Sequence, residues 1–370
     1  MVKLKMSMLP LKKTFSVVKI SNQLLLKMNI NPLKAPENEA SIMKHWKYTD
    51  KVYISCVCIT FNQEGYIRDA INGMLAQVTD YRFEVIIHDD VSTDNTRDIL
   101  LEYSNKYPNI IKLVLQEENQ YKKGKKITPL ATAHANGEYV ALCEGDDYWI
   151  DKNKIQNQAN HLKNNASINI CFTSAKSISN SSLVKFISHH SSEKEIYTVA
   201  QVLEGGGAFM PTASIMLKTK LMHNLPEWYY TAPVGDYFLQ IYSSTPNGAI
   251  YLPDLTCVYR IHSSGSWSSQ RKCLSIQEIK SEGALYIETL QQLKNIGISQ
   301  ELIDREISKQ YIHLTSLAIK NNFFQDAMSL IDISWKYSKN ITKKQTILYY
   351  TKVFYPCIKL WISVKKALKN

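Results

Sequence analysis

The sequence predicts an α/β fold, in which a mostly parallel sheet is flanked by helices and followed by a C-terminal helical region. Between Val52 and about residue 165, short β-branched apolar runs alternate with segments of helical spacing. This alternation is typical of parallel strands joined by right-handed crossovers. From about Ser275 onward the chain shows helical spacing only.

The first half should contain four buried strands, each followed by a helix. The expected strands are VYISCVCIT (52–60), FEVIIH (83–88), IIKLVL (110–115) and EYVALC (138–143). The expected helices follow them at residues 65–77, 97–107, 130–137 and 150–162.

The pattern is looser beyond residue 165. Strands are expected at 168–175 and 213–217, and a short helix at 235–244. Two further strands, 249–253 and 255–262, are separated by Pro253, which marks a turn or a sheet edge. We therefore expect a basic N-terminal extension over residues 1–50, a sheet-containing domain over 51–270 and a helical region over 271–370.

Composition narrows the class of protein. The chain has 370 residues with 45% hydrophobic residues, and no run of 18 uncharged apolar residues predicts a membrane-spanning helix. Its seven cysteines form no C-x-x-C pair, which argues against a disulfide framework or a zinc site and favours a reducing cytosol. Cys56 and Cys58 are expected as small core residues on one strand face.

The net charge of +11 is concentrated at the two ends of the chain. Residues 1–50 carry +6, residues 334–370 carry nine Lys and no acid, and the middle is left with about −4. This distribution favours ends that meet an anionic surface over a nucleic-acid-binding core.

The last residues predict an interfacial helix. Lys352, Lys359 and Lys366 recur every seven residues among aromatic and aliphatic side chains, and Pro356 should kink any helix there. Such a stretch fits anionic lipid headgroups. The alternative is a helix that packs its apolar face on the protein or on a second subunit.

Acidic residues follow two of the expected strands. Asp89 and Asp90 end the second strand, and in parallel sheets ligands bind at the carboxyl ends of the strands. A carboxylate there can accept a hydrogen bond from a base imide or a ribose hydroxyl. For Asp94 and Thr96, helix capping is the alternative explanation.

A second acidic cluster lies in CEGDDYW, residues 143–149. Glu144 and Asp146 should point to one side of an extended chain and Asp147 to the other. The first two can converge on Mg²⁺ or Mn²⁺, which bind substrate phosphates, while Asp147 caps the next helix. The alternative is that all of these acids are cap residues.

These segments together resemble the family 2 glycosyltransferases, inverting enzymes of the GT-A fold. The resemblance covers roughly residues 52–270 and rests on CITFNQEGYIRDAI, DDVSTDNT, GEYVALCEGDDYW, VGDYFL and YRIHSSGSWS. It implies that Asp90 contacts the nucleotide base and that Glu144-Gly145-Asp146 replaces the family's D-x-D motif. Because this chain has Glu at the first position, Asp146 is the better metal ligand.

The resemblance also suggests roles for the remaining candidates. Asp236, in the family's position for the general base, would deprotonate the acceptor hydroxyl, although it could instead cap a helix. His262 is a candidate metal ligand or a structural residue. Residues expected at the donor site are Thr60, Asn62, Glu64, Asp89, Asp90, Glu144 and Arg260.

Three further features leave both a functional and a structural interpretation open. Trp149 and Trp267 could stack on sugar rings of the acceptor or belong to the core. The loop YKKGKK, residues 121–126, could clamp a phosphate or be solvated. Gly205–Gly207 lacks the G-x-G-x-x-G pattern of a dinucleotide site.

The expected function is an inverting glycosyltransferase that uses Mn²⁺ or Mg²⁺ and a nucleotide-sugar, UDP-linked, to extend a glycan or a lipid-linked acceptor in bacterial surface-polysaccharide synthesis. The expected location is the cytoplasm, at the inner face of the plasma membrane. One alternative is a sugar nucleotidyltransferase, which would need a basic Gly-rich loop where this chain has FNQEGY. Another is a non-catalytic glycan-binding protein.

Overall fold

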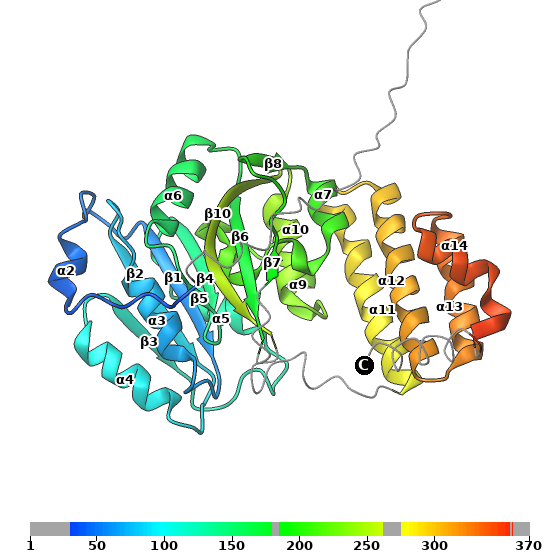
Figure 1. Ribbon diagram of the computed structural model, residues 1–370, viewed down its shortest axis with the longest axis horizontal. Coiled ribbons are helices and arrows are strands. Elements are labelled where there is room, and N and C mark those ends of the chain that lie inside the picture. Colours follow the sequence, from blue (N-terminus) through cyan, green and yellow to red (C-terminus); the bar gives the residue numbers. More distant parts are fainter. Residues whose placement is uncertain (1–29, 180–184, 262–274, 356, 358–370) are drawn as a thin grey trace, which may run out of the picture.

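A central twisted sheet with helices on both faces lies beside a separate group of C-terminal helices, α11 to α14 (Figure 1). This computed structural model describes residues 30–179, 185–261, 275–355 and 357. The predicted α/β fold with a C-terminal helical region is confirmed.

The sheet has ten strands in the spatial order β3-β2-β1-β4-β9-β6-β10-β5, with β7 beside β6 and β8 beside β10. Strands β3, β2, β1 and β4 run parallel, as do β6 and β10, whereas β5, β7, β8 and β9 run antiparallel to their partners. The bounds are β1 (Ile54–Thr60), β2 (Phe83–Asp89), β3 (Ile111–Leu115), β4 (Tyr139–Glu144), β5 (Tyr148–Trp149), β6 (Ile170–Ile178), β7 (Lys185–Ile187), β8 (Glu195–Tyr197), β9 (Met216–Lys218) and β10 (Ala249–Arg260).

The helices of the sheet domain are α2 (Glu39–Met43), α3 (Ile67–Leu75), α4 (Thr96–Lys106), α5 (Ile127–Thr132), α6 (Lys154–Asn164), α7 (Val199–Gly205), α8 (Thr219–Met222), α9 (Glu227–Thr231) and α10 (Gly235–Ser244), with 3₁₀ turns η1 (Gly207–Phe209) and η2 (Thr212–Ser214). The C-terminal group contains α11 (Ile276–Gln292), η4 (Leu293–Ile296), α12 (Gln300–Lys320), α13 (Phe324–Tyr337), α14 (Lys343–Tyr350) and η5 (Lys352–Phe354). A capping box of Ser275 and Glu278 begins α11, and Ser299 caps α12.

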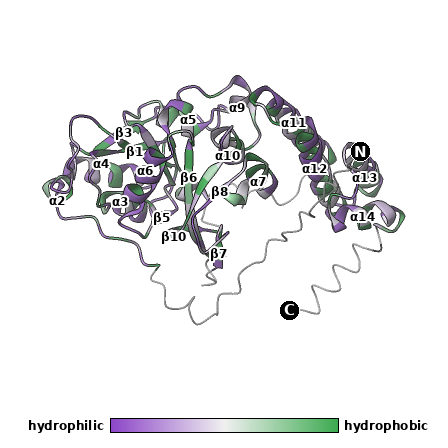
Figure 2. Ribbon diagram, turned by 90° about the horizontal axis from the view of Figure 1, so that it is seen from above, coloured by the Kyte–Doolittle hydropathy of each residue, from purple (hydrophilic) through white to green (hydrophobic). Residues whose placement is uncertain are grey.

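The central strands are buried on both faces, which explains their continuous apolar runs. On one face Cys56 and Cys58 join a core with α3, α4 and α6, as expected for small core residues. On the other face Val57 and Leu142 pack with residues of α5, α9, α10 and α11. In Figure 2, strands such as β6 carry the green of hydrophobic residues, whereas green alternates with the purple of hydrophilic residues along α11 and α13.

One sequence expectation needs correction. Pro253 does not separate two strands, because β10 continues through it with register shifts against β6 between Leu252 and Cys257. The described part of the N-terminal extension packs against the sheet domain. Ile42 is buried in the sheet core, and the ring of Trp46 packs edge-on against Phe83 at a centroid distance of 5.6 Å.

Among the described residues, no helix is both long enough and apolar enough to cross a bilayer.

Candidate active site

The carboxyl ends of β1, β2 and β4 meet at one edge of the sheet, because β1 pairs in parallel with both neighbours. The backbone N–H of Gly145 donates to the carbonyl of Ile59 at 3.0 Å, and the N–H of Asp90 donates to the carbonyl of Thr60 at 3.1 Å. The segments FNQE, HDD and EGDD are therefore neighbours at this edge.

Gly145 is required by close packing within this edge. A Cβ on Gly145 would stand 2.8 Å from Oγ1 of Thr60, too close for any side chain, and would also collide with Gln63. The Thr60 hydroxyl itself donates to Oε1 of Gln63 at 2.8 Å. The glycine thus lets the acidic turn lie directly against the end of β1.

Glu144 and Asp146 lie in a strongly negative environment. Burial raises the pKa of Glu144 to about 8, and the negative charges of Asp146 and then Asp236 add to the rise. Such a group favours a cation beside it, because a cation offsets the repulsion between the carboxylates. Oxygen ligands of this kind suit a hard divalent ion.

A complete metal site does not appear within the described part of the chain, where no group of three or more His, Cys, Asp or Glu side chains is arranged to hold an ion. The candidate ligand His262 lies outside the described residues, and so does Trp267. The pair of Glu144 and Asp146 fits a divalent ion by its charge and its oxygen donors, as part of a ligand set.

Asp147 points into the protein and does not cap α6, so the predicted cap is wrong. The helix begins after Asn153 and has no side-chain cap. One carboxylate oxygen of the fully buried Asp147 accepts the backbone N–H of Arg260 at 2.9 Å, and the other has no hydrogen-bond partner among the described residues. Burial raises the pKa of Asp147 well above its usual range, and the charges of Glu144 and Asp146 add to the effect.

Arg260 fastens the acidic turn to the helix layer. Its guanidinium donates to the Asp146 carbonyl at 2.8 Å and to Oδ2 of Asp69 at 2.5 Å. Its planar group also lies over the rings of Tyr148, at 4.3 Å from the centroid, and Tyr66, at 5.1 Å. These contacts position the turn, and they occupy much of the guanidinium's hydrogen-bonding capacity.

Two of the expected donor-site residues join the loops that follow β1 and β2. Asn62 Oδ1 accepts the backbone N–H of Thr93 at 2.7 Å. Glu64 Oε2 accepts from the backbone N–H of Asn95 at 2.9 Å and from its side-chain amide at 2.8 Å. These side chains therefore build the edge of the site by holding its two loops together.

The adjacent acids Asp89 and Asp90 have different surroundings. Asp89 is fully buried and forms an ion pair with Arg97 at 2.6 Å. Asp90 accepts the backbone N–H groups of Gln120 and Tyr121, at 2.7 and 3.0 Å. Asp90 thereby fixes the loop that follows β3 against the carboxyl edge of the sheet.

Val91, directly after these acids, has a left-handed backbone with φ of 67°. This conformation is unfavourable for a β-branched residue and costs about 1–3 kcal/mol. The side-chain hydrogen bonds of Asp89 and Asp90 on one side, and of Ser92 on the other, hold the turn in this shape.

Asp236 lies in the first turn of α10 and is exposed to solvent. Val234, not Asp236, occupies the cap position, and Asp236 accepts the backbone N–H of Tyr237 at 2.7 Å. Desolvation by surrounding protein raises the pKa of Asp236, and the positive charge of Lys126 acts in the opposite direction.

Lys126, at the end of the basic loop 121–126, is half-buried beside Asp236. Its ammonium donates to the carbonyl of Ala232 at 2.5 Å, just before the turn that leads into α10. Burial lowers the pKa of Lys126, and the charge of Asp236 opposes that change. Lys123 of the same loop instead pairs with Glu118 in solvent.

Trp149 lies in the core, where it is fully buried and its indole N–H donates to the carbonyl of Ala213 at 2.9 Å. The core alternative for this residue is therefore the one that its position fits. Sequence reasoning missed Tyr259. Burial raises the pKa of Tyr259 to about 12, and the charges of Asp147, Glu144, Asp146 and Asp236 contribute, so this phenol lies among the acids.

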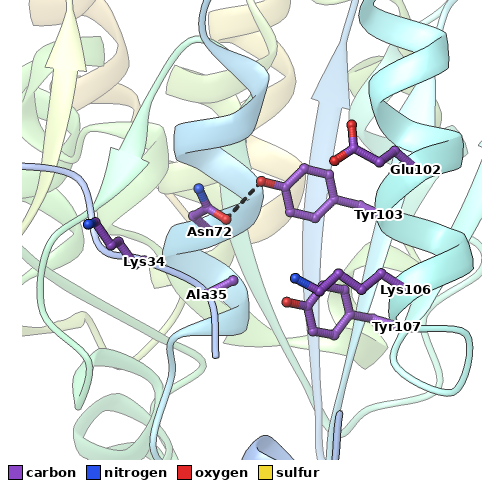
Figure 3. A pocket seen from close by; sticks show the side chains of 7 residues that line it. All are labelled: Lys34, Ala35, Asn72, Glu102, Tyr103, Lys106 and Tyr107. Atoms are coloured by element: carbon purple, nitrogen blue, oxygen red, sulfur yellow. Dashed lines mark hydrogen bonds between the residues drawn. The ribbon is translucent and has the colours of Figure 1, made fainter. Parts of the chain in front are cut away.

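A separate cavity of about 180 Å³ lies away from these acids. It is bounded by the N-terminal segment, α3 and α4, and its lining residues are Lys34, Ala35, Asn72, Glu102, Tyr103, Lys106 and Tyr107 (Figure 3). Tyr103 points from α4 to Asn72 of α3 and donates to its amide oxygen at 2.9 Å. This cavity contains no residue predicted for the active site.

Comparison with known proteins identifies the domain. The profile of the family described as Glycosyl transferase family 2 matches residues 55–225. An uncharacterized protein of Mycobacterium tuberculosis is 33% identical over 217 residues, which are 58% of this chain and 61% of that protein. The match thus spans about three fifths of this relative's length.

Two relatives carry names that state an activity. The putative teichuronic acid biosynthesis glycosyltransferase TuaG of Bacillus subtilis is 37% identical over 31% of this chain and 42% of its own. The Escherichia coli enzyme WfgD, named a UDP-Glc:α-D-GlcNAc-diphosphoundecaprenol β-1,3-glucosyltransferase, is 34% identical over 37% of this chain and 52% of its own.

A solved structure with the same fold is that of residues 1–349 of Staphylococcus aureus TarS in complex with UDP-GlcNAc. It matches with a TM-score of 0.59 and 18% identity over 83% of this chain and 88% of that one. At this identity the likeness establishes the GT-A fold alone. Together with the family match, it shows a GT-A fold in which residues 55–225 form a family 2 glycosyltransferase domain.

Proposed function

We propose that this chain is an inverting glycosyltransferase that moves a sugar from a UDP-linked donor to a glycan or a lipid-linked acceptor of the bacterial cell surface. The observation that carries the proposal is the proximity of Asp236 to the Glu144–Asp146 turn, which is close enough for Asp236 to raise the pKa of Glu144. A donor diphosphate at the turn would place its sugar near Asp236. The names of WfgD and TuaG support a cell-surface product, and the UDP-linked donor in the name of WfgD supports UDP.

In this mechanism Asp236 is the general base. Its carboxylate takes the proton of the acceptor hydroxyl as that oxygen attacks the anomeric carbon. The bond from the anomeric carbon to the diphosphate breaks at the same time, and its electron pair leaves with the nucleoside diphosphate. Attack from the opposite face inverts the anomeric configuration.

The donor diphosphate needs positive charge beside it. Asp146, with His262, would hold a Mn²⁺ or Mg²⁺ ion, which would act as a Lewis acid on the leaving diphosphate. Arg260 supports this arrangement indirectly, because its guanidinium donates to the carbonyl of Asp146 and its backbone N–H donates to the carboxylate of Asp147. We assign Asp90 to the nucleotide base and Thr60, Asn62 and Glu64 to the neighbouring donor-site loops.

The C-terminal region would bring the enzyme to a lipid-linked acceptor at the inner face of the membrane. Four apolar side chains of α14 and η5 are exposed, Ile347 by 59%, Tyr350 by 69%, Val353 by 68% and Phe354 by 60%. They precede a stretch rich in lysine, and apolar side chains beside lysines fit an anionic lipid surface.

A screen of nucleotide-sugars tests the proposed function. Thermal stabilisation and donor hydrolysis are measured with UDP-, GDP- and dTDP-linked sugars, each with and without Mn²⁺. We expect UDP-sugars to stabilise the protein only with the metal, and Asp146→Ala to lose this stabilisation while keeping the wild-type melting temperature without ligand. Normal donor turnover by Asp146→Ala would overturn the metal assignment. Formation of a nucleotide-sugar from a nucleoside triphosphate and a sugar phosphate would instead favour a nucleotidyltransferase.

A further inference from the structure

The turn Gly205-Gly206-Gly207 connects α7 to η1 and reaches the proposed base. At two of its positions, the local structure itself requires glycine. Gly206 has a left-handed backbone with φ of 74°, which favours glycine. A Cβ on Gly205 would overlap the ring of Phe209.

Neither backbone conformation nor close packing requires glycine at position 207. Its backbone lies outside the left-handed region, and a Cβ built on it would stand 3.7 Å from Cβ of Tyr237 and 3.9 Å from Oδ2 of Asp236. Both are ordinary van der Waals distances. Backbone conformation and packing would therefore accept alanine here, and what the glycine leaves open is the space next to the Asp236 carboxylate.

The position of Gly207 relative to Asp236 is fixed by α10 itself. The side chain of Gln240, one helical turn after Asp236, is fully buried. Its amide donates to the carbonyl of Gly207 at 3.0 Å and to that of Met210 at 2.9 Å. The glycine turn and the base are thus held together by one helix.

Proton abstraction sets a geometric requirement at this point. The acceptor oxygen must come within about 2.6–3.2 Å of the base, and the carbon that bears the hydroxyl needs room just beyond it. A side chain at position 207 would stand beside the same carboxylate oxygen and compete for that room. Water needs far less space than a sugar alcohol.

We propose that Gly207 forms one wall of the acceptor subsite and determines how large a hydroxyl-bearing acceptor can reach Asp236. This inference rests on the proposed role of Asp236 as the base.

The test compares nucleophiles of increasing size. The UDP-sugar that the wild-type protein hydrolyses is incubated with methanol, 1-propanol or benzyl alcohol, and alkyl glycosides and free sugar are quantified. We expect Gly207→Val to lower the ratio of benzyl glycoside to free sugar at least tenfold relative to wild type. Gly207→Ala should give a smaller loss, and the smaller alcohols should be less affected. Ala208→Val, on the neighbouring exposed residue, is the matched control and should partition like wild type.

Each outcome has a distinct meaning. A protein that hydrolyses no nucleotide-sugar contradicts the proposed function itself. Hydrolysis without alcoholysis by the wild type, or an unchanged partition in both Gly207 variants, overturns the inference. An equal loss of hydrolysis and alcoholysis in Gly207→Ala, at an unchanged melting temperature, also overturns it. If Gly207→Val does not fold, Gly207→Ala decides the question.

Discussion

Asp236 is exposed at the start of α10, and its carboxylate is held by the backbone N–H of Tyr237 on one oxygen. The other oxygen lies on the side of Gly207. A base needs such an accessible oxygen, and it needs a pKa that leaves it charged at neutral pH while still able to take a proton. Desolvation raises the pKa of this carboxyl, and the positive charge of Lys126 opposes that rise.

Asp236→Asn should therefore lose transfer while keeping donor affinity. We expect kcat to fall by about 10²- to 10⁴-fold, because only the proton acceptor is removed. Calorimetric titration with the donor checks the affinity, and NMR of the product checks that wild type inverts the anomeric configuration. Retention of configuration would rule out a single displacement with Asp236 as the base.

Lys126→Met should move the acid limb of the kcat/KM profile to higher pH. Asp236 must be deprotonated to work, so activity is lost as the pH falls through its pKa, and removal of a neighbouring positive charge raises that pKa. The other groups around Asp236 are Glu144, Tyr229, Tyr259 and Tyr286, which the substitution leaves in place.

Two control variants separate charge from structure in that experiment. Lys126→Arg keeps the charge and should keep the wild-type limb. Lys123→Met removes a solvent-exposed lysine of the same loop and should leave the profile unchanged. A limb that stays in place in Lys126→Met would show that Lys126 does not act on the base.

At the scale of elements, a single glutamine fastens α14 to the rest of the helical region. Gln345 is fully buried, and its amide donates to the hydroxyls of Ser308 and Ser334 at 3.0 Å each and to the carbonyl of Ser338 at 2.7 Å. Its oxygen accepts the backbone N–H of Ile341 at 3.0 Å. This polar centre ties together α12, α13 and α14.

Gln345→Leu should lower the free energy of unfolding of the helical region by about 1–3 kcal/mol, because the N–H of Ile341 loses its acceptor inside the protein. Urea unfolding followed by tryptophan fluorescence measures the change, and hydrogen exchange of α14 locates it. Gln325→Leu, on the exposed face of α13, should change stability by less than about 0.5 kcal/mol. Equal stabilities of the two variants would show that the polar centre contributes nothing.

Across the whole molecule, charge and exposed apolar surface coincide at the C-terminal end. The helix α14, which carries exposed Ile347 and Tyr350, lies at the opposite end of the molecule from α2 (Figure 1). Lys352 in this region is partly neutralised by Asp332 at 2.5 Å, so lysines farther along the chain must supply much of the attraction.

Full-length protein should float with vesicles of phosphatidylglycerol and phosphatidylcholine at low salt, and high salt should weaken this binding. Removal of residues 358–370, which contain four lysines, should abolish most of the vesicle binding. The double variant Tyr350→Glu, Phe354→Glu should do the same. The truncation keeps Tyr355, which is fully buried in the helical core. Protein that ignores anionic vesicles at low salt would leave packing, or a second subunit, as the explanation of the apolar surface.

The strands that the sequence predicted most closely are those of the parallel half of the sheet. Residues 83–88 and 138–143 became β2 and β4 with shifts of one residue at most. Such strands are buried on both faces, so their apolar runs are continuous and stand out locally. The short strands β5, β7 and β8 were missed, because two or three residues form a strand only where a distant partner offers hydrogen bonds.

The sequence by itself determined that acids would gather at one edge of a parallel sheet, because β-strand patterns and the rule of crossovers are local properties of the chain. Only the tertiary structure decided which way each side chain of the turn points. Asp147 points inward to accept a hydrogen bond from Arg260, and Trp149 points inward to donate one to Ala213. Both partners come from later segments of the chain. Lys126 reaches the turn before Asp236 across 106 residues of chain. No local pattern encodes such contacts, because they depend on how separate elements pack.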